Sequence, residues 1–529
     1  MSSERHGTAD TAGASAFASG MSWKLTTQVV TQATRIGVAI LLARLMSPFE
    51  FGVAGLALVF APLAYVFTDL GAALVQQRDQ TENDRSTAFW TSLAVGTVIT
   101  LLGIAAAGPI ARFYGEPEVQ NLFIVLSASF VVTAATTTHS ALLHRALAFR
   151  QIELANMISV IGASAVAVTV ALLGGGAWAI VLQLVGGAVL LFCLLWVFDP
   201  WRPHFRYSWA SLRSIASFTA HNTGANLLHY FERNTDNLLI GRFLGPSALG
   251  LYSIAYNLML YPVTRLADPV HQVLFPLLSR IQDDDARVAR VWLRVTRSVA
   301  AIVAPLMVGL VILAPEFIRV LLGAKWDGAV PIVQILALAG LVYAVRIAST
   351  SVLLATGRAR ALFHFSLVSA VVLVTGFAIT VQWGVNAVAA SFTASFVVLT
   401  PVLVWLAARA VGSSLRVYAV NLLPVTAATV IMTVVVILAR HALLQAGASA
   451  LVVLLLATAV GAAVYTPLCL WLAPDLRSEI ATGWSALRRR ARSDGGGEPS
   501  DQRTDGTHAA SPGPQTAVGE GRRVRNEQA

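Results

Sequence analysis

The sequence predicts an all-α polytopic membrane protein with about 14 transmembrane helices, arranged as two parallel-repeat six-helix bundles plus two C-terminal helices. Of its 529 residues, 56% are hydrophobic and 12% are charged, and the mean hydropathy is +0.69. Soluble domains carry about 25% charged residues. Since about 20 apolar residues cross a bilayer core of roughly 30 Å, the apolar runs leave no room for a large extramembrane catalytic domain. An internal repeat, described below, divides the helices into the two bundles.

Apolar runs that are broken by charges and turn residues mark the helices in order. The expected spans are residues 23–44, 54–77, 88–111, 119–143, 154–174, 177–198, 212–241, 248–276, 298–322, 330–354, 362–383, 386–408, 417–439 and 448–472. We divide the chain into an N-terminal segment (1–20), a first bundle (21–200), a second bundle (201–410), two extra helices (411–474) and a tail (475–529). Because the two end segments contain few apolar residues, we expect them to be disordered.

Arginine in the short loops predicts the orientation of the helices. Alternate loops carry 16 basic residues, among them a group of five between 280 and 297, whereas the opposite loops carry only six. Basic residues are enriched in cytoplasmic loops. The sequence therefore predicts that both termini are cytoplasmic, in agreement with an even number of helices.

A repeated segment relates the first six helices to the next six. ARLMSPFEFGVA at 43–54 aligns with GRFLGPSALGLY at 241–252, 198 positions later, so that Pro48 and Gly52 correspond to Pro246 and Gly250. Six helices separate equivalent positions, and both halves therefore cross the membrane in the same sense. In transporters with such parallel repeats, substrate sites lie between the halves near the middle of the membrane.

Ionisable side chains inside the expected spans are the candidate site residues, because an ionised group at the bilayer centre costs about 3 kcal/mol or more. They are Arg35, Asp69, Glu232, Arg233, Asp236, Arg265, Asp268 and Arg346. Arg35 and Arg233 occupy one repeat position, and Asp69 aligns within one residue of Asp268. We expect these residues to line equivalent surfaces of the two halves.

Polar residues three or four positions apart extend these faces along the helices. The sets are Gln28, Gln32 and Arg35; Asn222, Asn226, His229, Arg233 and Asp236; Tyr256, Asn257, Tyr261 and Arg265; and Tyr343, Arg346 and Thr350. Aromatic faces with amide and guanidinium donors suit a glycan that carries carboxylate or phosphate groups. The alternative is structural: the arginines and carboxylates form ion pairs between helices, and His229 is a packing residue.

Two segments resemble bacterial polysaccharide flippases. The run VVTQATRIGVAILLARLMSPFEFGVAGLA, followed by TDLGAALVQ, resembles the start of these proteins, and ERNTDNLLIGRFLGPSALGLYSIAYNL resembles their seventh and eighth helices. The family is that of the Wzx-type lipid-linked oligosaccharide flippases, in the branch of the colanic and teichuronic acid exporters. It belongs to the multidrug, oligosaccharidyl-lipid and polysaccharide exporter superfamily.

This resemblance implies a MATE-like, V-shaped pair of bundles in the bacterial inner membrane. By alternating access it would move an undecaprenyl-pyrophosphate-linked oligosaccharide to the outer leaflet, for the biosynthesis of surface polysaccharide or lipopolysaccharide. Arg35, Arg233, Arg265 and Arg346 match the family's cationic cavity, and Asp69, Glu232, Asp236 and Asp268, with His229, are the groups available for proton or ion coupling. Partners would be membrane lipids, a polymerase and a chain-length regulator. Carboxylates beside the arginines depart from the family pattern and weaken the expected anion selectivity.

Two other functions stay open. A drug or cation exporter of the same superfamily would need a carboxylate-rich and aromatic site with few arginines. A membrane glycosyltransferase or polymerase would need a loop with acid/base carboxylates. The longest internal loop expected, around 280–297, is about 20 residues long, basic and partly helical. We expect no catalytic residues, no cofactor, no metal site and no nucleic-acid partner.

Overall fold

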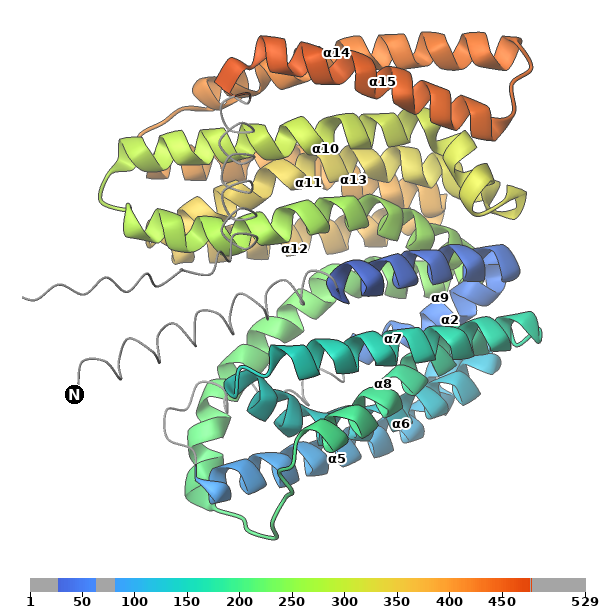
Figure 1. The fold of residues 1–529 in the computed structure, drawn as a ribbon, viewed down its shortest axis with the longest axis vertical. Coiled ribbons are helices and arrows are strands. Elements are labelled where there is room, and N and C mark those ends of the chain that lie inside the picture. Colours follow the sequence, from blue (N-terminus) through green and yellow to red (C-terminus); the bar gives the residue numbers. More distant parts are fainter. Residues whose placement is uncertain (1–26, 63–80, 476, 478–529) are drawn as a thin grey trace, which may run out of the picture. The chain divides into compact units, whose positions relative to one another are not determined.

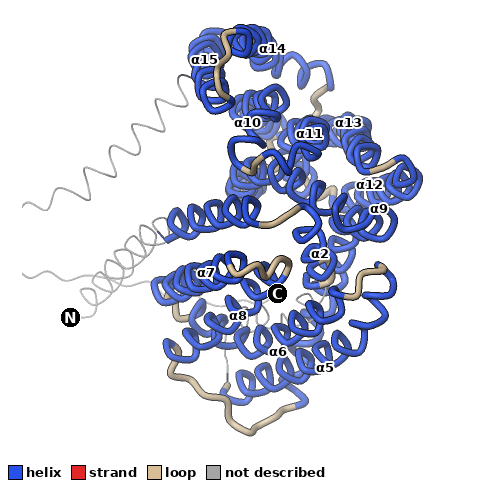
Figure 2. Tube along the Cα trace, turned by 90° about the vertical axis from the view of Figure 1, so that its right-hand side faces the viewer, coloured by secondary structure: helices blue, strands red, loops and turns tan. Residues whose placement is uncertain are grey.

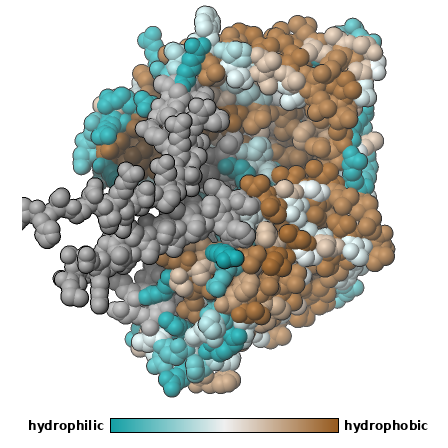
Figure 3. All heavy atoms as spheres, in the orientation of Figure 1, coloured by the Kyte–Doolittle hydropathy of each residue, from teal (hydrophilic) through white to brown (hydrophobic). Residues whose placement is uncertain are grey.

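The computed structural model describes residues 27–62, 81–475 and 477, without the side chains of 214–229, 231–232, 266–269 and 271. This described part is helical and contains no strand, and 11 of its helices are long and apolar enough to cross a membrane. Figure 3 shows apolar side chains over much of the visible face and hydrophilic residues toward its margins. The predicted all-α polytopic membrane fold is confirmed.

The first bundle follows the expected order of spans. Its helices cover residues 27–45, α2 Pro48–Leu58, α5 Glu82–Tyr114, α6 Glu118–Arg145, α7 Phe149–Leu172 and α8 Trp178–Phe198. Helix α2 begins at Pro48 rather than at 54, because Ser47 and Glu50 form a capping box and Pro48 occupies the first turn. The later part of the expected span 54–77 lies outside the described residues.

The second bundle contains a long helix, α9 Trp209–Arg280, that changes direction once. Gly245 has φ +82° and ψ 179°, a backbone conformation that favours glycine, and it divides α9 into the two expected helices. The other elements are α10 Asp285–Leu321, η1 Ala324–Ala329, α11 Val330–Ala355, α12 Ala359–Thr380, η2 Val381–Trp383 and α13 Val385–Ala410. Helix α10 begins at Asp285 rather than at 298, since Asp284 accepts a capping hydrogen bond from the Arg287 amide. The basic segment 280–297, expected to be partly helical, is therefore helical from Asp285 onward.

Two further helices, α14 Leu415–Gln445 and α15 Ala450–Leu472, pack against α10 (Figure 1). The Asn421 amide donates to the Leu293 carbonyl over 2.8 Å, and the Tyr465 hydroxyl donates to the Ala301 carbonyl over 2.7 Å. Farther along α14, the Arg440 guanidinium binds the Glu316 carboxylate over 2.8–2.9 Å. Helix α10 therefore holds both added helices by polar contacts as well as by apolar packing.

Replacing Arg440 by Leu is expected to lower the free energy of unfolding by about 2 kcal/mol, because the Glu316 carboxylate, only 6% exposed, loses its charged partner. Thermal unfolding in detergent measures the effect. The matched control is Arg319→Leu, whose pair with Asp327 is 60% and 39% exposed, so that water can replace the lost partner and the unfolding temperature should change much less. Equal losses in the two variants would contradict this account of the pair.

The two repeat segments lie against each other. Helix α2 of the first bundle crosses the part of α9 after Gly245, where Gly52 lies against Pro246 and Gly250 against Pro48. Figures 1 and 2 show α2 next to α9. The repeat alignment predicted their equivalence but not their contact. The two repeat segments thus form part of the junction between the halves.

The segment between α8 and α9 is bound to the first bundle. Asp199 accepts from His139 Nδ1 over 2.8 Å, and rings of Phe89, Trp196 and Trp201 surround the imidazole. The Trp201 indole donates to Glu82 over 2.8 Å, and the amide of Ser208 donates to Thr87. Residues 199–208 are therefore tied to α5, α6 and α8 along their length.

Candidate functional site

A buried carboxylate lies in the middle of α9. Asp236 is 3% exposed; one of its oxygens accepts from the Tyr252 hydroxyl over 2.8 Å, and the other from the Asn237 amide over 2.7 Å. Arg233, one turn earlier on the same helix, has an exposed side chain close to Asp236 and Tyr256. Three predicted site residues, Arg233, Asp236 and Tyr256, are thus brought together, and Tyr252 joins them.

An aromatic series continues from this cluster to the neighbouring helices. Tyr252 stacks on Tyr256 with ring centres 6.0 Å apart, and Tyr256 meets Phe392 of α13 at 5.8 Å. Phe392 in turn contacts Phe396 at 4.5 Å. Tyr256 and Tyr343 are half-buried, and Asn257 beside them is exposed.

Arg346 of α11 lies at the far end of the aromatic series. Its guanidinium carbon is 4.4 Å from the centre of the Phe396 ring and 5.5 Å from that of Phe365 on α12. Tyr343, one turn earlier, stacks on the same Phe396 ring at 5.8 Å. A cation held against two aromatic faces keeps its orientation, as binding of a carboxylate or phosphate requires. Tyr343 and Arg346, two residues of one predicted set, therefore contact the same ring.

The predicted residues of the first helix lie on a more open surface. Gln28 and Arg35 are exposed, and Gln32 is half-buried, with its Nε2 atom buried and without a hydrogen-bond partner among the described residues. In α9, Arg265 is also exposed and lies 5.3 Å from the Tyr261 ring. These residues remain candidates for substrate binding only because their side chains are at least partly exposed.

Several predicted residues fall outside the described part of the structure. Asp69 belongs to the segment 63–80. The side chains not described are those of Asn222, Asn226, His229, Glu232 and Asp268, although their backbone is part of α9. Within the described residues, no group of three His, Cys, Asp or Glu side chains could hold a metal ion.

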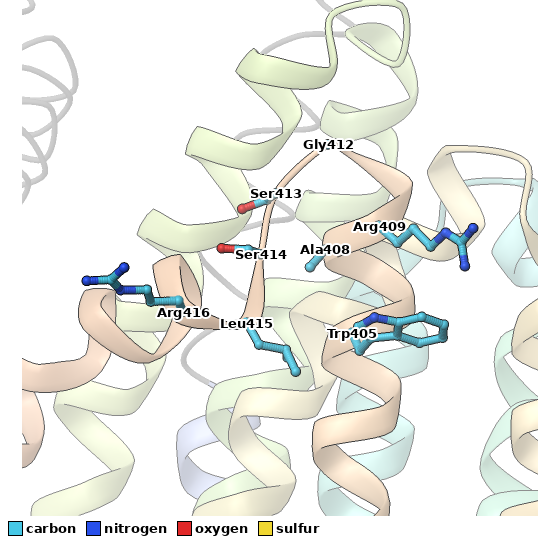
Figure 4. Close-up of a pocket in the computed structure, with 8 residues that line it drawn as sticks. All are labelled: Trp405, Ala408, Arg409, Gly412, Ser413, Ser414, Leu415 and Arg416. Atoms are coloured by element: carbon cyan, nitrogen blue, oxygen red, sulfur yellow. The ribbon is translucent and has the colours of Figure 1, made fainter.

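A cavity of about 540 Å³ lies at the loop between α13 and α14, outside the predicted site. Its lining includes Trp405, Arg409, Ser414 and Arg416. Figure 4 shows the side chains of Arg409 and Arg416 pointing to opposite sides, and Ser414 caps α14 through the Val417 amide. The two cations therefore do not converge on one ligand, and we assign no site there.

Sequence reasoning missed the aromatic neighbours that fix the arginine and the carboxylate. Tyr252 precedes Tyr256 by four residues, and Phe392 precedes Phe396 by four, so helical spacing could have identified both pairs. No pattern in the sequence predicts that α13 packs beside α11. The contact of Phe396 with Arg346 is therefore seen only in the structure.

Residues 41–331, more than half of the chain, match the family described as "Polysaccharide biosynthesis protein". The chain belongs to this family. Among curated members of similar sequence, the teichuronic acid biosynthesis protein TuaB of Bacillus subtilis is 29% identical over 59% of this chain and 67% of its own length. The lipopolysaccharide biosynthesis protein WzxC of Escherichia coli is 25% identical over 66% of this chain and 72% of its own length.

Solved transporters have the same fold as this member of the family. The lipid II flippase MurJ, in an inward closed conformation, covers 85% of this chain and 99% of its own with a TM-score of 0.70 and 15% identity. An inward-facing MATE multidrug transporter covers 72% of this chain and 94% of its own, with a TM-score of 0.56 and 14% identity. The predicted MATE-like fold is therefore confirmed.

Proposed function

We propose that the chain is a flippase that moves a lipid-linked oligosaccharide across the bacterial cytoplasmic membrane for surface polysaccharide biosynthesis. The observation that carries this proposal is Arg346, held against Phe396 and Phe365 at the end of an aromatic series. The family match and the names of TuaB and WzxC support a role in polysaccharide biosynthesis. The MurJ-like fold supports transport by alternating access. The excess of basic residues in alternate loops supports a cytoplasmic position for both termini.

The chemistry of the site fits a charged glycan-lipid. Aromatic rings such as Tyr256 and Tyr343 offer flat apolar faces to sugar rings, and guanidinium groups bind phosphate or carboxylate oxygens in pairs. We assign this role to Gln28, Gln32, Arg35, Asn222, Asn226, Arg233, Tyr256, Asn257, Arg265 and Arg346. Proton or ion coupling is assigned to Asp69, His229, Glu232, Asp236 and Asp268, and a polymerase and a chain-length regulator are the proposed partners.

Deleting the gene from its host tests the proposal. We expect loss of the surface polysaccharide together with accumulation of its lipid-linked precursor on the inner leaflet, both restored by the intact gene. Precursor on each leaflet is measured by glycan labelling of intact and of opened cells. Unchanged polysaccharide with raised retention of cationic drugs would favour a drug exporter instead. Glycosyl transfer by the purified protein would favour an enzyme.

The paired substitution Arg35→Gln and Arg233→Gln examines the repeat-related cations. We expect it to abolish polysaccharide output at normal expression, because each half loses the cation at its equivalent position. Arg112→Gln, on an exposed side chain near the end of α5, is the control and should leave output unchanged. A normal amount of surface polysaccharide in the paired variant would show that neither arginine is needed for transport.

A further inference from the structure

The two repeat segments cross without side chains between their backbones. At Gly52 of α2, a Cβ atom would overlap the carbonyl group of Pro246, and at Gly250 of α9 it would overlap the carbonyl oxygen of Pro48. The Cβ at Gly250 would also lie 3.1 Å from the Gly52 nitrogen. Glycine is therefore needed on both helices for this approach, as in close helix crossings inside membranes.

The crossing is symmetric with respect to the repeat. Pro48 and Gly52 correspond to Pro246 and Gly250 at one constant offset of 198 residues, and each proline faces the glycine of the other half. The contact continues along α2, where the Tyr230 hydroxyl donates to the Val59 carbonyl over 3.0 Å. A helix rises 1.5 Å per residue, so the junction from Pro48 to Val59 extends for roughly 16 Å, about half of a hydrocarbon core.

Polar contacts join the halves at the same end of the helices. The Arg44 guanidinium donates to the carbonyls of Val320 and Leu321, which terminate α10. In return, Lys325 donates to the Arg44 carbonyl and the Trp326 indole to the Ala43 carbonyl, each over 2.7 Å. These contacts satisfy carbonyls that a helix end leaves without intrahelical partners.

The equivalent arginine of the second half makes the reciprocal contact. Arg242 lies 5.4 Å from the Phe113 ring, which is near the end of α5 in the first half. Each half thus places the arginine of its repeat segment on a helix end of the other half. This end is opposite to the arginine-rich loops that the proposed function places in the cytoplasm.

We propose that this crossing is the outer gate of the transporter, and that Gly52 and Gly250 are the residues that allow it to close. The inference rests on the orientation given by the proposed function. When the halves separate at this end, the backbone contact is lost and a side chain at either position meets no obstacle. A methyl group at Gly52 or Gly250 therefore penalises the closed gate alone, and the equilibrium shifts toward the outward-open state.

Labelling of one cysteine from outside the cell tests the gate. Leu249→Cys is the reporter, because Leu249 is buried and would lie 3.4 Å from a Cβ at Gly55 in the crossing. It is placed in a chain with Cys193→Ser and Cys469→Ala. Gly52→Ala and Gly250→Ala should each raise labelling by a membrane-impermeant maleimide about fivefold or more in intact cells. The controls Gly108→Ala and Gly309→Ala, whose added Cβ atoms meet no atom within 4 Å, should leave labelling unchanged.

A second reporter separates gate opening from unfolding. Val119→Cys lies in the core of the first bundle with 0% exposure and should stay unlabelled in every folded variant. If Gly52→Ala exposes both reporters, labelling is measured in Arg44→Gln instead. This substitution removes a contact at the same end of the helices and adds no atoms to the crossing. Increased labelling of Leu249→Cys alone supports the gate, and unchanged labelling overturns it. Because labelling needs no transported substrate, this result is independent of the polysaccharide test above.

Discussion

Replacing Arg346 by Gln is expected to reduce the rate of polysaccharide appearance at the cell surface by about tenfold or more, since a charge-assisted contact to the substrate is lost. The guanidinium is held at 4.4 Å from Phe396 and 5.5 Å from Phe365, so it is oriented before the substrate binds. Pulse labelling of surface glycan in cells with equal protein levels gives the rate. Arg346→Lys should recover only part of it, because lysine keeps the charge but lacks the planar fork.

Arg409→Gln is the matched control for this prediction. Arg409 also lies over an aromatic ring, 5.5 Å from Trp405, but at the loop between α13 and α14. Removing it should leave the rate within about twofold, as expected for a surface change. Equal losses in the two variants would mean that the cation–π contact is structural in both places, and Arg346 would leave the proposed pathway.

Replacing Asp199 by Ala is expected to lower the free energy of unfolding by about 2–3 kcal/mol, because the buried His139 loses its hydrogen-bond partner. The two side chains are 0% and 8% exposed, and three aromatic rings exclude water from the imidazole. The loss also frees the segment 199–208 from α6. Thermal unfolding of purified protein in detergent measures the change.

The neighbouring pair of His204 and Glu82 supplies the comparison. Its distance of 3.0 Å is similar, but the side chains are 60% and 35% exposed, so water can replace either partner. His204→Ala should therefore cost below about 1 kcal/mol. If Asp199→Ala lowers the free energy of unfolding no more than His204→Ala does, burial does not determine the strength of the contact.

Much of the fold was predictable because membrane helices depend on local composition. The apolar runs gave the order of the helices, and the aligned pairs Pro48 with Pro246 and Gly52 with Gly250 gave the repeat. Errors occurred at helix ends. Capping by Ser47 and Asp284 depends on single polar side chains, and it extended α2 and α10 into segments that hydropathy assigned to loops.

The candidate site was predictable in part, because helical spacing identifies faces but not their neighbours. Helical spacing placed Arg233 and Asp236 on one predicted face and Tyr256 on another, and the structure brings Asp236 near Tyr256. The sequence offered arginine as the partner of Asp236, whereas the Tyr252 hydroxyl donates to its carboxylate. His139 and Asp199 lie 60 residues apart on different elements, and no periodic pattern connects them. Contacts between distant helices depend on tertiary packing, which a single sequence does not display.

The crossing of α2 and α9 has a consequence for the assembly of the halves. Its contact is isologous in character, since each side offers the same proline and glycine to the other, and such surfaces close on themselves with two copies. One six-helix half, expressed alone, would leave this face uncovered within the lipid. A second copy inserted in the same sense would offer it the matching surface, so the geometry that joins the halves is also that of a two-fold dimer of half-molecules.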